Sequence, residues 1–321
     1  MRLVVAAVMA VVAARVHAGE PTGTIAVLAA GSLANPMTQV FDAFVHRHPG
    51  VELEQETAGS LDLVRRVTEL GRRCDVLAVA DFEVLPALVV PRHATWWIAF
   101  ARNRLVLAHR ADARGAADLA RVPWYEVLLR PGVAQGHSDP DADPAGYRTL
   151  LAWQLAERHY GVPGLAKRLA DAVPERNIRP KSVELVALVQ AGELDYAWTY
   201  ESVAADAGLV AERLPPEVDL GDPARASTYG AVSVDVAGNR PGTRRTIRGL
   251  PILYGLTIPT GAPNPDGAAA LVAFLLSDEG RAALRRAHLD PLDRPQASDP
   301  AAVPAALRSS VAPLAFALPP G

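Results

Sequence analysis

Short apolar runs alternate with helical stripes over the first eighty residues of the chain. Residues 24–30 and 75–80 are apolar runs of the kind that form buried strands. Residues 36–45 and 61–70 carry apolar side chains at helical spacing, and residues 51–57 alternate as an outer strand does. Strand, helix, strand, helix, strand predicts a parallel sheet. Ligands of such sheets bind at the carboxyl ends of the strands, where the turns lie.

A second lobe is expected after this first sheet. Residues 96–101 and 105–108 are predicted to be paired strands around Arg102-Asn103, where the chain would cross into the second lobe. The apolar run 251–259 is expected to return as a strand to the first sheet. The expected segments are a signal peptide at 1–18, the first part of lobe I at 19–104, lobe II at 105–230, a return to lobe I at 231–295, and an Ala- and Pro-rich tail at 296–321.

Composition fits a secreted protein of two moderate domains. The chain has 321 residues, half of them hydrophobic, which is enough for packed cores. Arg2 followed by a short apolar stretch and Val16-His17-Ala18 predicts a secretory signal, and hence a periplasmic or secreted protein. No basic run points to nucleic acid. The single cysteine, Cys74, excludes an internal disulfide, and no Cys/His spacing indicates a metal site.

Candidate binding residues lie at the predicted turns between strands and helices. Gly31-Ser32 and Gly59-Ser60 follow predicted strands, and Asp143-Pro144-Ala145 begins a predicted helix with a capping residue and a proline at its first position. Ser182 begins another helix, and Tyr200 ends a strand. Free backbone N–H groups at helix starts attract anions, and hydroxyls donate hydrogen bonds without adding charge. The pattern therefore predicts a site that holds an anion mainly with neutral donors.

Three neighbouring side chains admit simpler interpretations. Asp143 is as well explained as a helix cap as by ligand contact. Arg148 lies one helical turn beyond the site and is interpreted as structural, with electrostatic support of the anion as the alternative. Glu201, next to Tyr200, is expected to face away from the ligand or to cap the next helix.

Several motifs together resemble one family of binding proteins. They are Ala29-Ala-Gly-Ser-Leu33, Thr57-Ala-Gly-Ser60, Asp143-Pro-Ala-Gly-Tyr-Arg148, Arg179-Pro-Lys181, Gly192-Glu-Leu-Asp-Tyr196, Tyr200-Glu-Ser-Val203 and Tyr254-Gly-Leu-Thr-Ile-Pro259. Each tripeptide alone is weak, whereas the set resembles the archaeal-type branch of the tungstate/molybdate-binding proteins of ABC importers. The resemblance extends from about Ile25 to Arg286.

The resemblance implies the type II periplasmic binding fold, in which two α/β lobes close on one tetrahedral oxyanion. It implies molybdate or tungstate as the ligand, no cofactor, and a membrane permease and an ATPase as partners; we expect the binding protein itself to be a monomer. The contacts that it implies by position are Ser32, Ser60, Asp143, Pro144, Ala145, Ser182 and Tyr200.

One position departs from that branch. The archaeal-type proteins carry a glutamate where this chain has Ser182, and that glutamate and the equivalent of Asp143 can bond the metal of the anion directly. Here only Asp143 could make such an inner-sphere contact, and no site for a free metal cation is expected. We therefore predict a tetrahedral oxyanion held by hydrogen bonds.

Two other functions compete with this prediction. Sulfate or phosphate has the same shape, and monohydrogen phosphate would need an acceptor for its proton, which Asp143 could supply. A secreted hydrolase would use Ser60 or Ser138 with His137 and an aspartate. The chain has no Gly-x-Ser-x-Gly motif, so we expect no enzymatic activity.

Overall fold

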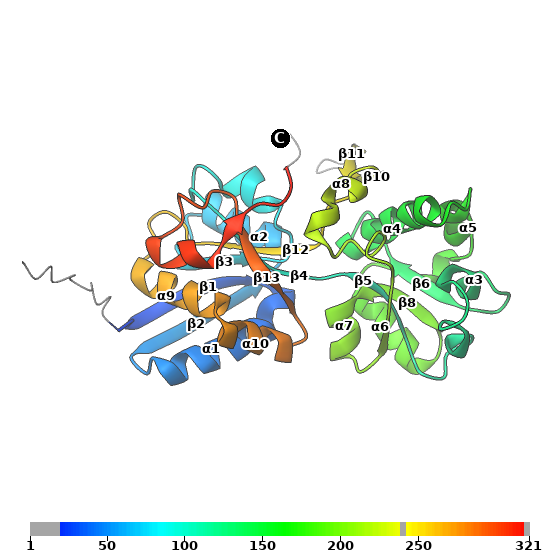
Figure 1. Cartoon of the computed structure of the whole chain (residues 1–321), viewed down its shortest axis with the longest axis horizontal. Coiled ribbons are helices and arrows are strands. Elements are labelled where there is room, and N and C mark those ends of the chain that lie inside the picture. Colours follow the sequence, from blue (N-terminus) through cyan, green and yellow to red (C-terminus); the bar gives the residue numbers. More distant parts are fainter. Residues whose placement is uncertain (1–19, 238–241, 318–321) are drawn as a thin grey trace, which may run out of the picture.

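Two sheets divide the chain into two lobes, which the computed structural model describes over residues 20–237 and 242–317 (Figure 1). The predicted signal peptide, residues 1–18, lies outside the described residues. Within the described part of the chain, no helix combines the length and the apolar character that crossing a membrane requires.

The sheet of lobe I has seven strands and is built from both ends of the chain. Its order is β14-β13-β4-β12-β3-β1-β2. The strands are β1 (Gly23–Ala30), β2 (Val51–Ala58), β3 (Val76–Val79), β4 (Ile98–Arg102), β12 (Leu253–Thr257), β13 (Asp290–Ala297) and β14 (Ala312–Pro313). Strand β1 is parallel to β2 and β3, as predicted, whereas β12 runs antiparallel to both β3 and β4. The sheet is therefore mixed.

Helices cover both faces of this sheet (Figure 1). They are α1 (Ala34–Arg47), α2 (Ser60–Thr68), the π-helical turn η2 (Leu85–Val89), α9 (Pro265–Leu276), α10 (Asp278–Arg286) and the 3-10 helix η6 (Ala305–Ser310). One core joins α1, α9 and α10 through side chains such as Phe41, Leu271 and Leu284. A second core joins α2 and η2 through Leu63 and Leu85. The sheet is thus buried on both sides, which explains its apolar strands.

Lobe II contains a five-stranded sheet in the order β7-β6-β8-β5-β9. Its strands are β5 (Leu105–His109), β6 (Gln135–Ser138), β7 (Ile178–Arg179), β8 (Tyr196–Tyr200) and β9 (Val210–Arg213). Its helices are α3 (Trp124–Leu128), α4 (Pro144–Tyr160), α5 (Leu165–Asp171), α6 (Ser182–Ala191), α7 (Glu201–Asp206) and α8 (Ala226–Tyr229). Strand β6 is parallel to both β7 and β8, so these three strands end at one edge of the sheet.

The predicted pairing of residues 96–101 with 105–108 was wrong. Strand β4 pairs with β12 and β13, and β5 pairs with β8 and β9, so the two strands belong to different sheets. The chain does cross between the lobes at Asn103, whose backbone N–H donates to the carbonyl oxygen of Ile252. Strand-like patterning identified both strands but carries no information about their partners.

The chain returns to lobe I later than residue 231. The hairpin of β10 (Ser233–Ala237) and β11 (Arg244–Arg248) is antiparallel, and its Val236 and Ile247 pack into the core of lobe II. Re-entry into the first sheet occurs at β12. The described part of the tail packs on lobe I: β14 pairs with β13, and the Phe316 ring lies edge-on to Phe82 at 5.7 Å.

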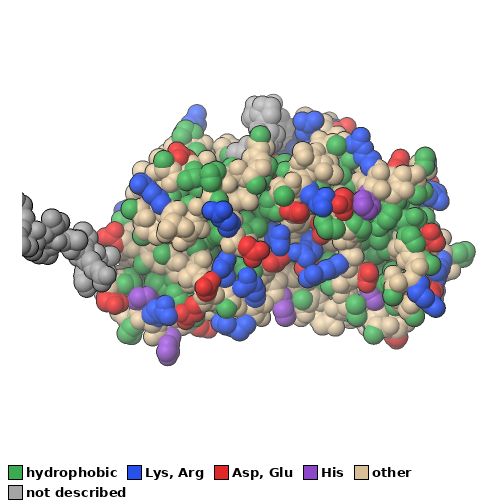
Figure 2. Space-filling model, in the orientation of Figure 1, with side chains coloured by type: hydrophobic (Ala, Val, Ile, Leu, Met, Phe, Trp, Pro, Cys, Tyr) green, Lys and Arg blue, Asp and Glu red, His purple; other side chains and the backbone are tan. Residues whose placement is uncertain are grey.

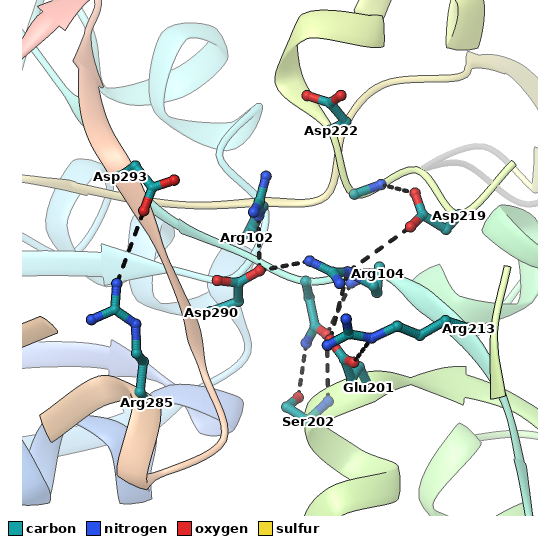
Figure 3. Close-up of polar contacts among 12 residues, drawn as sticks. Arg102, Arg104, Glu201, Ser202, Arg213, Asp219, Asp222, Arg285, Asp290 and Asp293 are labelled. Atoms are coloured by element: carbon teal, nitrogen blue, oxygen red, sulfur yellow. Dashed lines mark hydrogen bonds and ion pairs between the residues drawn. The ribbon is translucent and has the colours of Figure 1, made fainter. Parts of the chain in front are cut away.

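Charged and amide side chains hold the crossing between the lobes. Acidic and basic side chains are interspersed across the middle of the face in Figure 2, where the lobes meet. Arg102 and Arg104 both donate to the Asp290 carboxylate, at 2.8 and 2.6 Å (Figure 3). Arg104 also lies 3.5 Å from the Glu201 carboxylate, which Arg213 bonds at 2.6 Å. Glu201 is therefore engaged by two arginines at the crossing between the lobes, and its turning away from the ligand stays a prediction.

Asn103 joins the two lobes directly. Its side-chain amide donates to the Ser202 hydroxyl of lobe II at 2.8 Å and to the Tyr254 hydroxyl of lobe I at 3.1 Å. The residue is buried. One buried amide therefore links the two lobes at the point where the chain crosses between them.

Candidate functional site

The first-lobe half of the candidate site lies at the carboxyl ends of β1, β2 and β3. Register pairs Ala30 with Ala58, so Ser32 and Ser60 leave the sheet at the same edge. Ser32 is exposed in a single 3-10 turn, η1 (Gly31–Leu33). Ser60 is half-buried at the start of α2, and its Oγ accepts the Ala80 backbone N–H at 3.1 Å. Its hydroxyl proton therefore remains available to a ligand.

The second-lobe half lies at the carboxyl ends of β6, β7 and β8. Asp143, Pro144 and Ala145 follow β6 and begin α4, Ser182 follows β7 and begins α6, and Tyr200 ends β8. Because the three strands are parallel neighbours, these residues share one edge of the sheet. The structure thus gathers the predicted second-lobe residues as the sequence indicated.

Gly146 lets α4 begin against the end of β6. A Cβ on Gly146 would lie 2.2 Å from the carbonyl oxygen of Ser138, so any side chain there would push the helix away from the strand. The glycine is therefore a packing requirement that sets where α4 starts.

Asp143 caps two helices at once. Its Oδ1 accepts the Ala145 N–H at 3.3 Å, as predicted for a cap, and its Oδ2 accepts the Ser182 N–H at 2.7 Å. Lys181, the N-cap residue of α6, makes no side-chain capping bond, so Asp143 supplies the cap of that helix from outside it. The carboxylate thereby ties the starts of α4 and α6 together, which the sequence did not predict.

Arg148 lies directly behind Tyr200. Its Nη1 donates to the Tyr200 hydroxyl oxygen at 2.6 Å, and its guanidinium carbon lies 5.5 Å from the Tyr147 ring centroid and 5.7 Å from that of Tyr200. The residue is only 7% exposed. Among the residues that the structure describes, no carboxylate lies within 4.0 Å of its nitrogens. Arg148 is thus a buried cation bonded to a neutral phenol.

That contact makes Tyr200 a hydrogen-bond donor. Burial raises the pKa of Tyr200 to about 12, against the opposing effect of Arg148, so the phenol stays protonated near neutral pH. Because Arg148 already donates to its oxygen, the Tyr200 proton is directed toward another acceptor. The contact of Tyr200 with a ligand stays a prediction, and the geometry is that of a donor.

Two carboxylates of lobe I face this cation across the gap between the lobes. Asp81 and Glu83 follow β3, and both interact electrostatically with the second-lobe pair Tyr147 and Arg148. Glu83 lines, together with that pair, a small gap of about 10 Å³. Sequence reasoning missed both acids, although Asp81 comes directly after a predicted strand at the edge where ligands bind.

The residues proposed for a hydrolase do not form a catalytic triad. His137 bonds the backbone carbonyl oxygen of Ser138 through Nδ1 at 2.7 Å, and its ring lies edge-on to Trp153. Burial lowers the pKa of His137. Among the described residues, neither nitrogen of its ring bonds a serine hydroxyl, as a catalytic base would. Ser60 lies on the other lobe and bonds Ala80. Across residues 20–237 and 242–317 there is also no group of three His, Cys, Asp or Glu side chains that could hold a metal ion.

Two lobes that each offer the carboxyl ends of parallel strands to a shared gap define a periplasmic binding protein fold. A solved structure from Clostridium difficile, the substrate-binding domain of a putative molybdenum ABC transporter, has this fold. The two chains superpose with a TM-score of 0.63 at 18% identity, over 85% of this chain and all of that one. At this identity the likeness establishes the fold alone.

Sequence comparison then gives the family. The family model described as "Bacterial extracellular solute-binding protein" matches residues 25–290. An uncharacterized solute-binding protein of Petrotoga mobilis is 44% identical over 265 residues, 83% of each chain. A protein of Pyrococcus abyssi named "Molybdate/tungstate-binding protein WtpA" is 35% identical over 305 residues, 87% of this chain and 88% of that one. The chain belongs to the bacterial extracellular solute-binding protein family, which binds solutes and is not enzymatic.

Proposed function

We propose that this protein captures molybdate or tungstate outside the cytoplasm and delivers it to the permease and ATPase of an ABC importer. The observation that carries the proposal is the buried Arg148, which has no described carboxylate within ion-pair distance. Buried charges in proteins are normally paired, because an isolated charge loses its hydration without compensation. Asp81 and Glu83 of lobe I act on this cation only from beyond ion-pair distance, so an anion held between the lobes would be its direct ionic partner.

Donors around that charge would supply the affinity. Ser32, Ser60 and Tyr200 carry hydroxyls at the two facing sheet edges. The N–H groups of Ala145 and Ser182 are already bonded to Asp143, so the start of α4 adds no free donor of this kind. A hydrogen bond to a charged group contributes about 1.5–3 kcal/mol. Since nanomolar binding corresponds to about 12 kcal/mol, half a dozen such donors suffice before the costs of ordering are subtracted.

The capping geometry of Asp143 supports a hydrogen-bonded, four-coordinate oxyanion. Both carboxylate oxygens accept backbone N–H bonds, so the group is engaged in capping. A free carboxylate 4 Å from a unit negative charge would be repelled by about 4 kcal/mol at an effective dielectric constant of 20. With Ser182 in place of a second carboxylate, we propose that no protein oxygen enters the first shell of the metal.

The name of the Pyrococcus abyssi relative supports molybdate and tungstate as the ligands. Sulfate and phosphate remain the alternative within the same fold. Because both Asp143 oxygens accept backbone N–H groups, Asp143 is not the acceptor that monohydrogen phosphate needs for its proton; this engagement does not separate sulfate from molybdate.

Calorimetric titration of the mature chain with molybdate, tungstate, sulfate and phosphate tests the proposal. We expect tight binding of molybdate and tungstate, weaker binding of the other two, and displacement of one metal oxyanion by the other. Arg148→Gln is expected to weaken molybdate binding at least tenfold, whereas Arg158→Gln, on the exposed side of the same helix α4, is expected to bind as the wild type does. Tightest binding of sulfate, or no binding of any of the four, would overturn the proposal.

A further inference from the structure

Glu83 is a carboxylate without a close partner on the wall of the candidate site. It lies in the turn between β3 and η2, where the Asp81 carboxylate accepts the backbone N–H of Glu83 at 3.3 Å. Its own carboxylate makes no hydrogen bond or ion pair with any residue that the structure describes. Glu83 is partly buried and lines the gap that Tyr147 and Arg148 close from the other lobe.

Charges of both signs face this carboxylate. Asp81 adds a negative charge from the same turn, and Arg148 faces it from α4. Arg245 and Arg248 face it from β11, with both side chains largely in solvent, and the neutral Tyr147 phenol completes the wall. Asp81 and Glu83 of lobe I thus share the single buried cation Arg148 of lobe II. A bound dianion would interact with the same cation.

Arrival of a dianion therefore crowds negative charge around Arg148. The ligand would bring two negative charges to a site where Asp81 and Glu83 already supply two, against one buried guanidinium. A carboxylate surrounded by other negative charges lowers its electrostatic energy by taking up a proton. The carboxylate that accepts the fewest hydrogen bonds loses the least stabilisation when it is protonated. Asp81 is engaged by a backbone N–H, whereas Glu83 is not engaged.

We propose that Glu83 takes up one proton from solvent when the oxyanion binds, so that the loaded site contains a neutral Glu83 carboxyl. This inference rests on the proposed function and names a residue that discriminates among tetrahedral anions. Molybdate, tungstate and sulfate carry no proton and require one from solvent. Monohydrogen phosphate carries its own proton and can donate it in a hydrogen bond to the Glu83 carboxylate. Its binding should therefore take up fewer protons from solvent.

The titration of Glu83 agrees with this assignment. Burial, reinforced by Asp81 and opposed by Arg148 and Arg245, raises the pKa of Glu83 to about 7. A nearby dianion raises it further. At pH 8 the empty protein therefore holds Glu83 mostly ionised, and binding converts it to the protonated form.

Calorimetry at pH 8 in two buffers of different ionisation enthalpy measures the protons taken up per molybdate bound. The wild type is expected to take up close to one, and its affinity is expected to fall about tenfold per pH unit as the pH rises above 8. Glu83→Gln should take up none and should show a flat affinity profile. Glu193→Gln, an exposed glutamate of lobe II, should behave as the wild type does.

Asp81→Asn provides a second variant if Glu83→Gln fails to fold. Because Asp81 raises the pKa of Glu83, its neutralisation should move the onset of the pH dependence to lower pH without abolishing proton uptake. Molybdate binding without proton uptake in the wild type, or unchanged uptake in Glu83→Gln, would refute the role of Glu83 and leave the proposed function intact. Failure of the wild type to bind molybdate, tungstate or sulfate would instead refute the proposed function.

Discussion

Tyr200→Phe is the most direct test of the site because it removes one hydroxyl and leaves the ring. The phenol has two roles: its oxygen accepts from Arg148 at 2.6 Å, and its proton is free for the ligand. Loss of a donor to a charged ligand costs about 1.5–3 kcal/mol, or about ten- to a hundredfold in affinity. Loss of the acceptor leaves a buried Arg148 N–H unsatisfied, which costs about 1–3 kcal/mol of folding stability.

Tyr160→Phe is the matched control for that substitution. Tyr160 also lies in lobe II, and its hydroxyl also accepts a side-chain hydrogen bond, from Trp124 Nε1 at 3.2 Å, but it is remote from the site. Both variants should lower the melting temperature by a few degrees. Only Tyr200→Phe should weaken molybdate binding in calorimetry. Wild-type affinity in Tyr200→Phe, or an equal loss in Tyr160→Phe, would refute the assignment of Tyr200 as a ligand donor.

Four further predictions concern the ligand and the mature chain. Ser32→Ala and Ser60→Ala should each weaken molybdate binding about ten- to a hundredfold with folding intact by circular dichroism, and a variant with unchanged affinity would be removed from the site. X-ray absorption at the metal edge should count four oxygen neighbours in the bound oxyanion and more in Ser182→Glu, so six neighbours in the wild type would contradict hydrogen-bonded binding. Small-angle scattering should show compaction on adding molybdate, since a ligand that contacts both half-sites favours the closed arrangement of the lobes, and identical curves at saturation would argue against closure. The intact mass of the mature protein should correspond to cleavage near Ala18, a prediction that a chain retaining Met1 would disprove.

Local patterning predicted the elements of the fold well. The strand at 196–200, the helix stops at Gly161 and Gly192, and the return of residues 251–259 to the first sheet were all confirmed. Both glycines adopt a left-handed backbone at a helix end, which a side chain would disfavour, so their signal is purely local. The pairing of strands, by contrast, depends on contacts between segments far apart in the chain. The predicted pairing of 96–101 with 105–108 was wrong for that reason.

The candidate site likewise has a part that the sequence predicted and a part that it did not. Residues that begin helices after strands were predictable, because topology brings the carboxyl ends of parallel strands together. The cap that Asp143 gives to α6 and the opposition of Glu83 to Arg148 depend on packing between segments far apart in the chain. No spacing in the sequence encodes these contacts. Arg148 was interpreted as structural because its position one turn into α4 gives no sign that its side chain reaches Tyr200.

The discontinuous sheet of lobe I has a consequence for export. Lobe II occupies one continuous stretch of chain, whereas β4 finds its neighbours β12 and β13 only beyond that stretch. A chain emerging from a membrane with its N-terminus first therefore exposes the open edges of β3 and β4 while lobe II is already forming. Unpaired edges recruit other chains, so the growing protein is most prone to aggregation in this interval. A fragment that stops before β12 is accordingly expected to precipitate during secretion, even though it contains every residue of the candidate site.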